Sequence, residues 1–167
     1  MPLVPDVKEF QAKLEGLPVR KYRTGENVLS AGSATGRLLI LKSGAVEVVK
    51  DGVQLAEVSA AGAVFGELAL LMDQPHTADV RATEESEFHV ADAGMLRSGD
   101  PTVSVYLAAI LARRLDSANR ALIEIRRQIQ AGEPRRVLGE MVQKVEQMLI
   151  SDAELVYSGY PYNPYRA

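Results

Sequence analysis

The sequence predicts a mainly β fold with flanking α-helices, in which short antiparallel strands form a barrel or roll. Between residues 19 and 90, short apolar runs alternate with glycine-containing turns, which is typical of closed antiparallel sheets. Beyond Asp100 the apolar residues recur at steps of three and four, which indicates a long helix. The chain of 167 residues is long enough to bury one sizeable core.

A short helix is expected before the first strand, over residues 6–15. Phe10 and Leu14 are four residues apart and share one helical face. Asp6 can accept hydrogen bonds from the first free N–H groups of this helix, and Gly16 and Pro18 end it. Residues 1–18 therefore form the predicted N-terminal helical segment.

The β-roll is assigned to residues 19–99. Its clearest turn is Asp51-Gly52, because both residues tolerate the positive φ angles of a two-residue hairpin. The expected strands on either side of such turns cover residues 19–23, 28–30, 38–42, 45–49 and 53–58.

Residues 100–130 are predicted to form a dimerisation helix that starts near Pro101, whose missing N–H is no loss in the first turn. Alternating steps of three and four are the seam of a two-stranded coiled coil, and they favour a homodimer. The alternative is that this stripe packs on the chain's own roll; we expect its first part to do so and the later heptads to pair between chains. The seam consists of Ala108, Leu111, Leu115, Ala118, Leu122, Ile125 and Ile129.

Two further segments are expected after the break at residues 131–134. Residues 133–151 read as a second C-terminal helix, with Val137, Met141, Val145 and Met148 on one stripe. Residues 152–167 form a tail rich in Tyr and Pro, which is typical of extended or disordered chain.

Composition excludes several classes of function. The absence of cysteine excludes thiol catalysis and Cys-based metal sites. The start of the sequence does not resemble a leader and no apolar run is long enough to cross a membrane, so a cytoplasmic location is expected. No nucleophile–base pair or metal set is apparent, so no enzyme is predicted. The net charge of −3 lacks the basic footprint of a DNA-binding protein. A local arginine cluster is interpreted as a solvated helix face rather than a site for acidic partners; it comprises Arg113, Arg114, Arg120, Arg126, Arg127, Arg135 and Arg136.

The segment 64–72 carries the strongest chemical signal. Gly66 follows an apolar run and permits close approach of the backbone to a ligand, and the next residues read as one helical turn whose free N–H groups can receive an anion. Glu67 is a single carboxylate among apolar neighbours, which is costly to bury without hydrogen bonds. Either a ligand hydroxyl or a backbone N–H could supply them.

The sequence resembles the cyclic-nucleotide-binding domain family in four separated stretches, residues 21–29, 42–48, 61–71 and 75–82. This family provides the sensor domain of catabolite-activator-type regulators, kinase regulatory subunits and gated channels. The resemblance implies a double-stranded β-helix (jelly roll), a cAMP or cGMP ligand, and no other cofactor. It also implies that Glu67 binds the ribose 2′-hydroxyl. The implied ligand-binding residues are Phe65, Gly66, Glu67, Leu68, Ala69, His76, Thr77 and Ala78.

The sequence departs from this family at His76, which stands where the family has its phosphate-binding arginine. Arginine is always charged and can donate two N–H groups to a phosphate, whereas histidine is mostly neutral at pH 7. His76 is then a weaker, pH-dependent phosphate ligand, or the site no longer takes a cyclic nucleotide, or the side chain points to solvent. A metal or haem role for His76 and His89 is the least favoured interpretation.

The predicted function is a stand-alone sensor that binds a cyclic nucleotide and relays the signal through its C-terminal helices to an unidentified protein effector. No helix-turn-helix pattern follows the long helix, so no direct DNA binding is expected. The alternative is a degenerate cyclic-nucleotide-binding fold that binds no nucleotide and acts as a dimeric interaction module.

Overall fold

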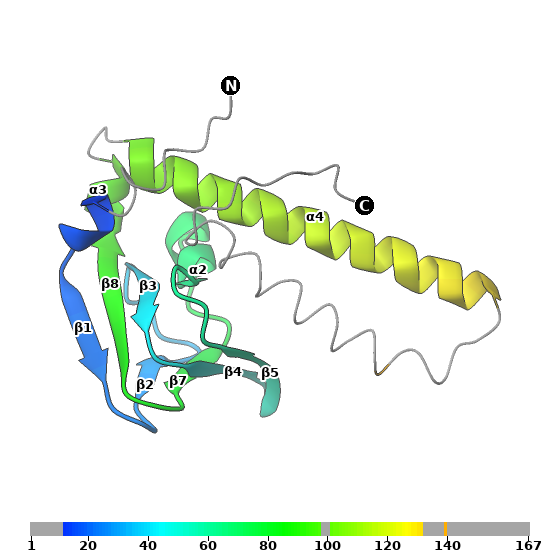
Figure 1. Cartoon of the computed structure of the whole chain (residues 1–167), viewed down its shortest axis with the longest axis horizontal. Coiled ribbons are helices and arrows are strands. Elements are labelled where there is room, and N and C mark those ends of the chain that lie inside the picture. Colours follow the sequence, from blue (N-terminus) through cyan, green and yellow to red (C-terminus); the bar gives the residue numbers. More distant parts are fainter. Residues whose placement is uncertain (1–11, 98–100, 132–138, 140–167) are drawn as a thin grey trace.

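In the part of the chain that the structure describes, eight strands form two four-stranded antiparallel sheets beneath the long helix α4 (Figure 1). This computed structural model describes residues 12–97, 101–131 and 139. The elements are β1 (Val19–Tyr22), β2 (Asn27–Leu29), β3 (Arg37–Ser43), β4 (Val46–Lys50), β5 (Val53–Val58), β6 (Val64–Phe65), α2 (Glu67–Met72), β7 (Asp79–Ala82), β8 (Ser86–Asp92), α3 (Ala93–Arg97) and α4 (Pro101–Ala131).

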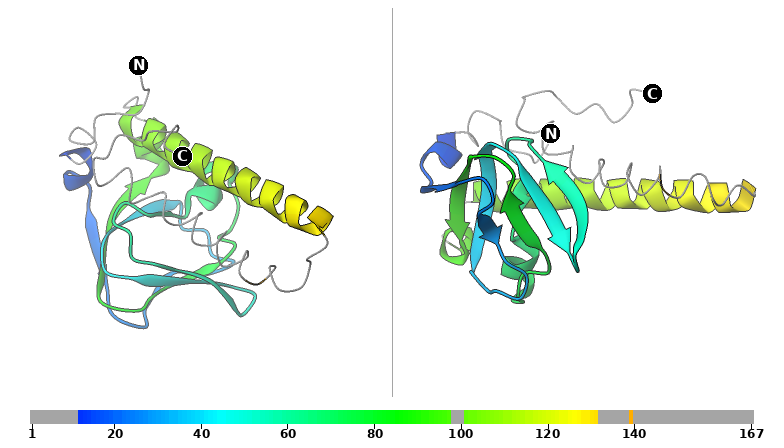
Figure 2. Two further views of the ribbon diagram at one scale, coloured as in Figure 1. Left: turned by 45° about the vertical axis from the view of Figure 1, so that its right-hand side comes forward. Right: turned by 90° about the horizontal axis from the view of Figure 1, so that it is seen from below.

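The strand order confirms the predicted antiparallel roll. One sheet runs β1-β8-β3-β6 and the other β2-β7-β4-β5, and the pairings within both are antiparallel. The view from below shows the strands gathered around one interior (Figure 2). The Asp51-Gly52 turn is confirmed as well, because both residues have positive φ, 52° and 78°.

Strand β3 separates two hydrophobic cores, because side chains alternate between the faces of a strand. Leu39 and Leu41 point between the sheets, where they meet Val46, Phe65 and Phe88. Leu38 and Ile40 point to the other face, where the helices pack. The run of four consecutive apolar residues is therefore explained by burial on both sides of the strand.

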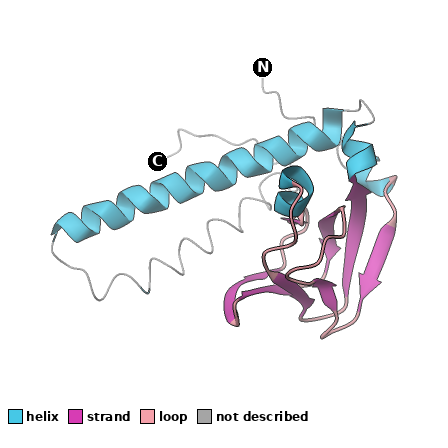
Figure 3. Ribbon diagram, turned by 180° about the vertical axis from the view of Figure 1, so that it is seen from behind, coloured by secondary structure: helices cyan, strands magenta, loops and turns pink. Residues whose placement is uncertain are grey.

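Helix α4 is fixed to the roll through its first three turns. Val103, Tyr106, Leu107 and Ile110 are buried in the second core. The Tyr106 hydroxyl also donates a hydrogen bond of 3.0 Å to the carbonyl oxygen of Gly62, next to the cavity described below. Beyond this anchor the helix extends past the sheets, as the side and rear views show (Figures 2 and 3).

The predicted coiled-coil seam lies mostly on a different face of α4 from the anchor. Leu115, Leu122 and Ile129 are 63%, 63% and 59% exposed, and they recur every seven residues. Ala108 is also exposed, so the expectation that the start of the seam packs on the roll is wrong for this residue. Leu111 does contact the second core. The roll uses a neighbouring stripe, because positions 103, 106, 107 and 110 lie on another side of the helix.

Several sequence predictions fall partly or wholly outside the described residues. Residues 12–15 are helical, and the rest of the predicted helix over 6–15 lies outside. The second helix over 133–151, except Gly139, and the tail over 152–167 also lie outside. Within the described ranges, no helix is long and apolar enough to cross a membrane.

Candidate functional site

A cavity of about 390 Å³ opens inside the roll, between α2, the β4–β5 hairpin, the segment before β7, and α4. All eight residues proposed from the family resemblance line this cavity: Phe65, Gly66, Glu67, Leu68, Ala69, His76, Thr77 and Ala78. Its remaining walls are mainly apolar and include Leu29, Val48, Leu55 and Val80. The volume falls in the range of small-molecule sites.

Gly66 allows the chain to turn from β6 into α2 at the cavity wall. Its φ is +84°, a left-handed conformation that only glycine adopts freely. A Cβ atom here would lie 2.6 Å from the carbonyl oxygen of Arg37 and 3.3 Å from the His76 ring. The backbone and the imidazole therefore approach each other closely, and Glu67 becomes the first residue of α2.

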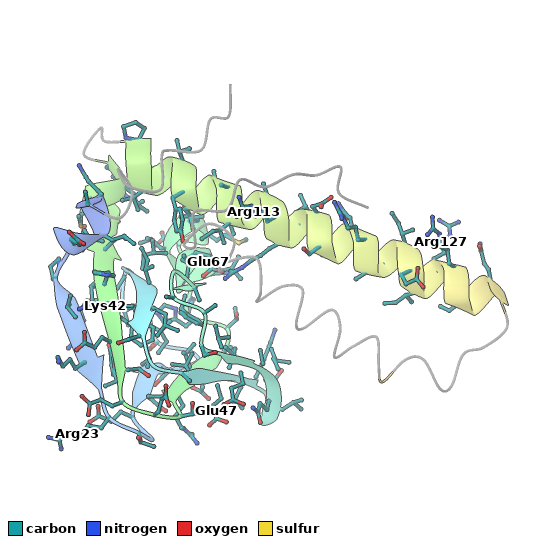
Figure 4. The ribbon with its side chains drawn as sticks, in the orientation of Figure 1. Arg23, Lys42, Glu47, Glu67, Arg113 and Arg127 are labelled. Atoms are coloured by element: carbon teal, nitrogen blue, oxygen red, sulfur yellow. The ribbon has the colours of Figure 1, made fainter. Side chains whose placement is uncertain are left out.

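Glu67 is held by a residue from the long helix. Nη1 of Arg114 forms an ion pair with Oε1 of Glu67 at 2.5 Å, and Nη2 donates to the carbonyl oxygen of Val64 at 2.9 Å. The two side chains are only 10% and 26% exposed, for Glu67 and Arg114 respectively. Figure 4 places Glu67 directly beneath α4. The interpretation of Arg114 as part of a solvated face is therefore wrong. Its guanidinium group is the hydrogen-bond donor that compensates the burial of the Glu67 carboxylate.

His76 is buried, with 6% of its surface exposed, so the interpretation that it points to solvent is wrong. Its Nε2 atom lies 2.9 Å from the Thr35 hydroxyl. Its backbone N–H donates a hydrogen bond to the carbonyl oxygen of Ser33, and its carbonyl oxygen accepts one from the N–H of Gly32. Burial lowers the pKa of His76 below its usual value, and the nearby Glu67 carboxylate only partly opposes this shift. The ring is therefore mainly neutral at pH 7.

Sequence reasoning missed three residues at or beside the site. Arg114 and Lys50 line the cavity, and the Thr35 hydroxyl forms a hydrogen bond with Nε2 of His76. Each comes from an element distant in sequence from the segment 64–78, and none belongs to a recognisable motif. For Lys50 the period-two pattern of β4 was a usable signal, because Val46, Val48 and Lys50 share one strand face.

The second histidine is not part of this site. His89 lies on β8, paired with Val19 and Ile40, and its Nδ1 atom is buried without a hydrogen-bond partner. Burial and the nearby Lys42 ammonium lower its pKa. Among the described residues no group of three or more His, Cys, Asp or Glu side chains could hold a metal ion.

The two-sheet roll encloses a cavity of small-molecule size, and the long helix α4 contributes Arg114 to its wall. Residues 19–99 match the sequence profile described as "Cyclic nucleotide-binding domain". This part of the chain therefore belongs to the cyclic nucleotide-binding domain family, as the four motifs predicted.

Curated relatives carry similar segments inside much longer proteins. The chain is 38% identical over 79 residues to a cAMP-dependent protein kinase regulatory subunit of Yarrowia lipolytica, covering 47% of this chain and 21% of that protein. It is 39% identical over 109 residues to Glutaminase 1 of Bradyrhizobium diazoefficiens, covering 60% and 18%. The chain thus spans about a fifth of the length of these relatives.

Solved structures share the fold. The N-terminal domain of a transcriptional regulator from Streptomyces coelicolor matches with a TM-score of 0.52 and 28% identity, covering 68% of this chain and 84% of that one. The Catabolite Activator Protein of Thermus thermophilus matches with a TM-score of 0.58 and 22% identity, covering 95% and 97%. The second likeness is one of fold alone.

Proposed function

We propose that this chain is a sensor that binds cAMP or cGMP in the roll cavity and relays binding through α4 to a protein effector. The observation that carries the proposal is the ion pair between Glu67, in the cavity wall, and Arg114, on α4. The carboxylate that we expect to bind the ligand is thereby connected to the helix that leaves the roll. The relatives that are named cAMP-dependent regulatory subunits support this choice of ligand.

Glu67 and the adjacent backbone suit a ribose phosphate. The Arg114 ion pair is to Oε1 of Glu67, so Oε2 can accept a hydrogen bond from a ribose hydroxyl. Gly66 brings the backbone close to the cavity without a side chain in the way. Leu29, Val48 and Val80 offer apolar walls to a purine ring.

The phosphate would meet His76 as a neutral ring that can gain a proton. An anion beside the imidazole raises its pKa, whereas burial without the anion lowers it. At a pH between the pKa of His76 in the free protein and its higher pKa in the complex, the complex holds one proton more than the free protein. Affinity is therefore expected to rise as the pH falls through this window.

The relay would act on the position of α4. A ligand shifts a conformational equilibrium only by binding the two arrangements with different affinity. A ribose hydroxyl that donates to Oε2 of Glu67 would share the carboxylate with Arg114, which would weaken the ion pair and so change the energy of holding α4 against the roll. We further propose that the exposed seam pairs two chains into a homodimer, and that the protein acts in the cytoplasm without catalysis, direct DNA binding or membrane attachment.

The test is calorimetric titration of the purified chain with cAMP and with cGMP, at pH 6 and at pH 8. Micromolar binding that is weaker at pH 8 is expected. Glu67→Gln should reduce the affinity about tenfold, because a neutral amide oxygen is a weaker acceptor than a carboxylate. No heat with millimolar ligand at either pH would overturn the proposal, and would leave the dimeric interaction module as the function that fits the fold.

A further inference from the structure

We propose that Lys50, at the end of β4, binds the anionic group of the ligand with its ammonium. This inference rests on the proposed function, since it concerns the same cavity. It assigns a ligand-binding role to the end of β4, a part of the roll that none of the predicted site residues occupies.

The strand register places Lys50 beside the segment that contains His76. In the β4–β7 ladder, Val48 pairs with Val80 and Val49 pairs with Asp79. The ladder ends at this pair, so Lys50 and Ala78 are the next residues along the chain, just beyond Val49 and Asp79. Side chains two residues apart on a strand point to the same face, so Lys50 shares the face of Val48. Lys50 and Ala78 both line the cavity, together with Val48 and Val80.

The balance of charge in the cavity also favours Lys50. The ionisable side chains among the described residues that line it are Lys50, Glu67, His76 and Arg114. Glu67 and Arg114 neutralise each other in their ion pair, and burial keeps His76 neutral. Lys50 has no ion-pair partner among the described residues. Its ammonium is therefore the uncompensated positive charge of the cavity.

The chemistry of a lysine suits this role. An ammonium on a flexible four-carbon stem is a compact charge with three donors, which can bind a phosphate oxygen without the fixed geometry of a guanidinium. Lysine side chains in general are charged at pH 8, whereas burial lowers the pKa of His76 and keeps its ring neutral there. Binding of a cyclic nucleotide at pH 8 would then depend more on Lys50 than on His76.

The experiment compares charged and uncharged ligands at pH 8. Titration of Lys50→Gln with cAMP and cGMP should show affinities reduced about tenfold, the usual effect of removing a hydrogen bond to a charged group. Adenosine and guanosine, which lack the phosphate, should bind the variant and the native chain alike. Lys50→Arg keeps the charge and should retain most of the affinity for the cyclic nucleotides.

Lys21→Gln is the matched control, because Lys21 carries the same charge on β1, where it pairs with Glu87 outside the cavity. It should leave the affinities unchanged, and circular dichroism should show both glutamine variants to be folded. If Lys50→Gln binds cyclic nucleotides as tightly as the native chain, the role of Lys50 is overturned and the proposed function stands. Equal loss for nucleosides and cyclic nucleotides would overturn the assignment to the anionic group. Failure of the native chain to bind any cyclic nucleotide would overturn this inference together with the proposed function.

Discussion

His76 shows how the surroundings of one side chain set the charge of a binding site. The ring is enclosed by the cavity wall, the Thr35 hydroxyl and the close approach of Gly66. The Thr35 oxygen also accepts the backbone N–H of Arg37 at 3.3 Å, so the hydroxyl is held in place by a second contact. A neutral imidazole fits these surroundings better than a charged one, because few groups nearby would stabilise the added charge.

Replacing His76 with arginine should restore a permanent charge next to the proposed phosphate position. His76→Arg is expected to bind cAMP or cGMP about tenfold more tightly at pH 8, since charge-assisted hydrogen bonds are about twice as strong as neutral ones. The difference in affinity between pH 6 and pH 8 should shrink as well. Isothermal titration at both pH values measures both effects.

The control for this prediction is His76→Gln, which removes the titrating group without adding charge. It should lose the pH dependence and gain no affinity. If His76→Arg binds no more tightly than the native chain at pH 8, the imidazole does not face the anion of the ligand.

The residues of the site were predictable where they belong to one continuous motif. The segment 65–69 and the cassette 76–78 were identified from sequence, and all of their predicted residues line the cavity. Arg114 and Lys50 could not be found in this way, because their roles depend on which strands pair and on where α4 crosses the roll. Arg114 in particular stands among several arginines that share its local pattern.

At the scale of elements, α2 depends on Gly66 for both its conformation and its space. Gly66→Ala is expected to destabilise the fold by about 3 kcal/mol or more, since it adds a steric clash to a left-handed backbone that costs about 1–2 kcal/mol for other residues. The clash is with the Arg37 carbonyl oxygen, 2.6 Å from the added Cβ. Chemical denaturation of the variant and the native chain measures the difference in the free energy of unfolding.

Gly52→Ala separates these two contributions. Gly52 has a similar φ of +78°, but a Cβ atom added there would meet nothing within 4 Å. Its cost should be about 1–2 kcal/mol, that of the backbone alone. Equal destabilisation by the two variants would mean that the backbone around Gly66 relaxes around the added methyl group.

Strands and turns followed from local sequence more completely than the packing between them. The Asp51-Gly52 hairpin and the strand around residues 38–42 were predicted and are present. Burial on both faces of β3 could not be predicted from the strand itself, because it depends on α4 covering the outer face. In the same way, the stripe of α4 that anchors to the roll was not distinguished from the heptad seam beside it.

At the scale of the whole molecule, the exposed seam predicts the oligomeric state. Leu122→Gln should weaken a homodimer without unfolding the roll, because Leu122 lies away from the buried anchor of α4. Sedimentation equilibrium of the variant and the native chain measures the change in the dimer dissociation constant. A shift of tenfold or more is expected for one apolar core position of a coiled coil.

Ile123→Gln is the matched control, since Ile123 is the next residue, is 53% exposed and lies off the seam. It should dimerise as the native chain does. A native chain that sediments as a monomer would contradict the homodimer, and equal effects of the two variants would mean that the contact does not follow the heptad seam.

The anchor at Tyr106 holds α4 near one end, so residues farther along the helix move farther when the helix tilts. Its hydroxyl and the buried residues around it hold the helix at the Gly62 corner of the roll. At 1.5 Å per residue, Arg114 stands about 12 Å from this pivot and Ile129 about 35 Å. A tilt that moves Arg114 by a given distance therefore moves the far end of the helix about three times as far. By geometry alone, a shift of a fraction of an ångström at the cavity wall would thus be enlarged at the exposed end of the helix.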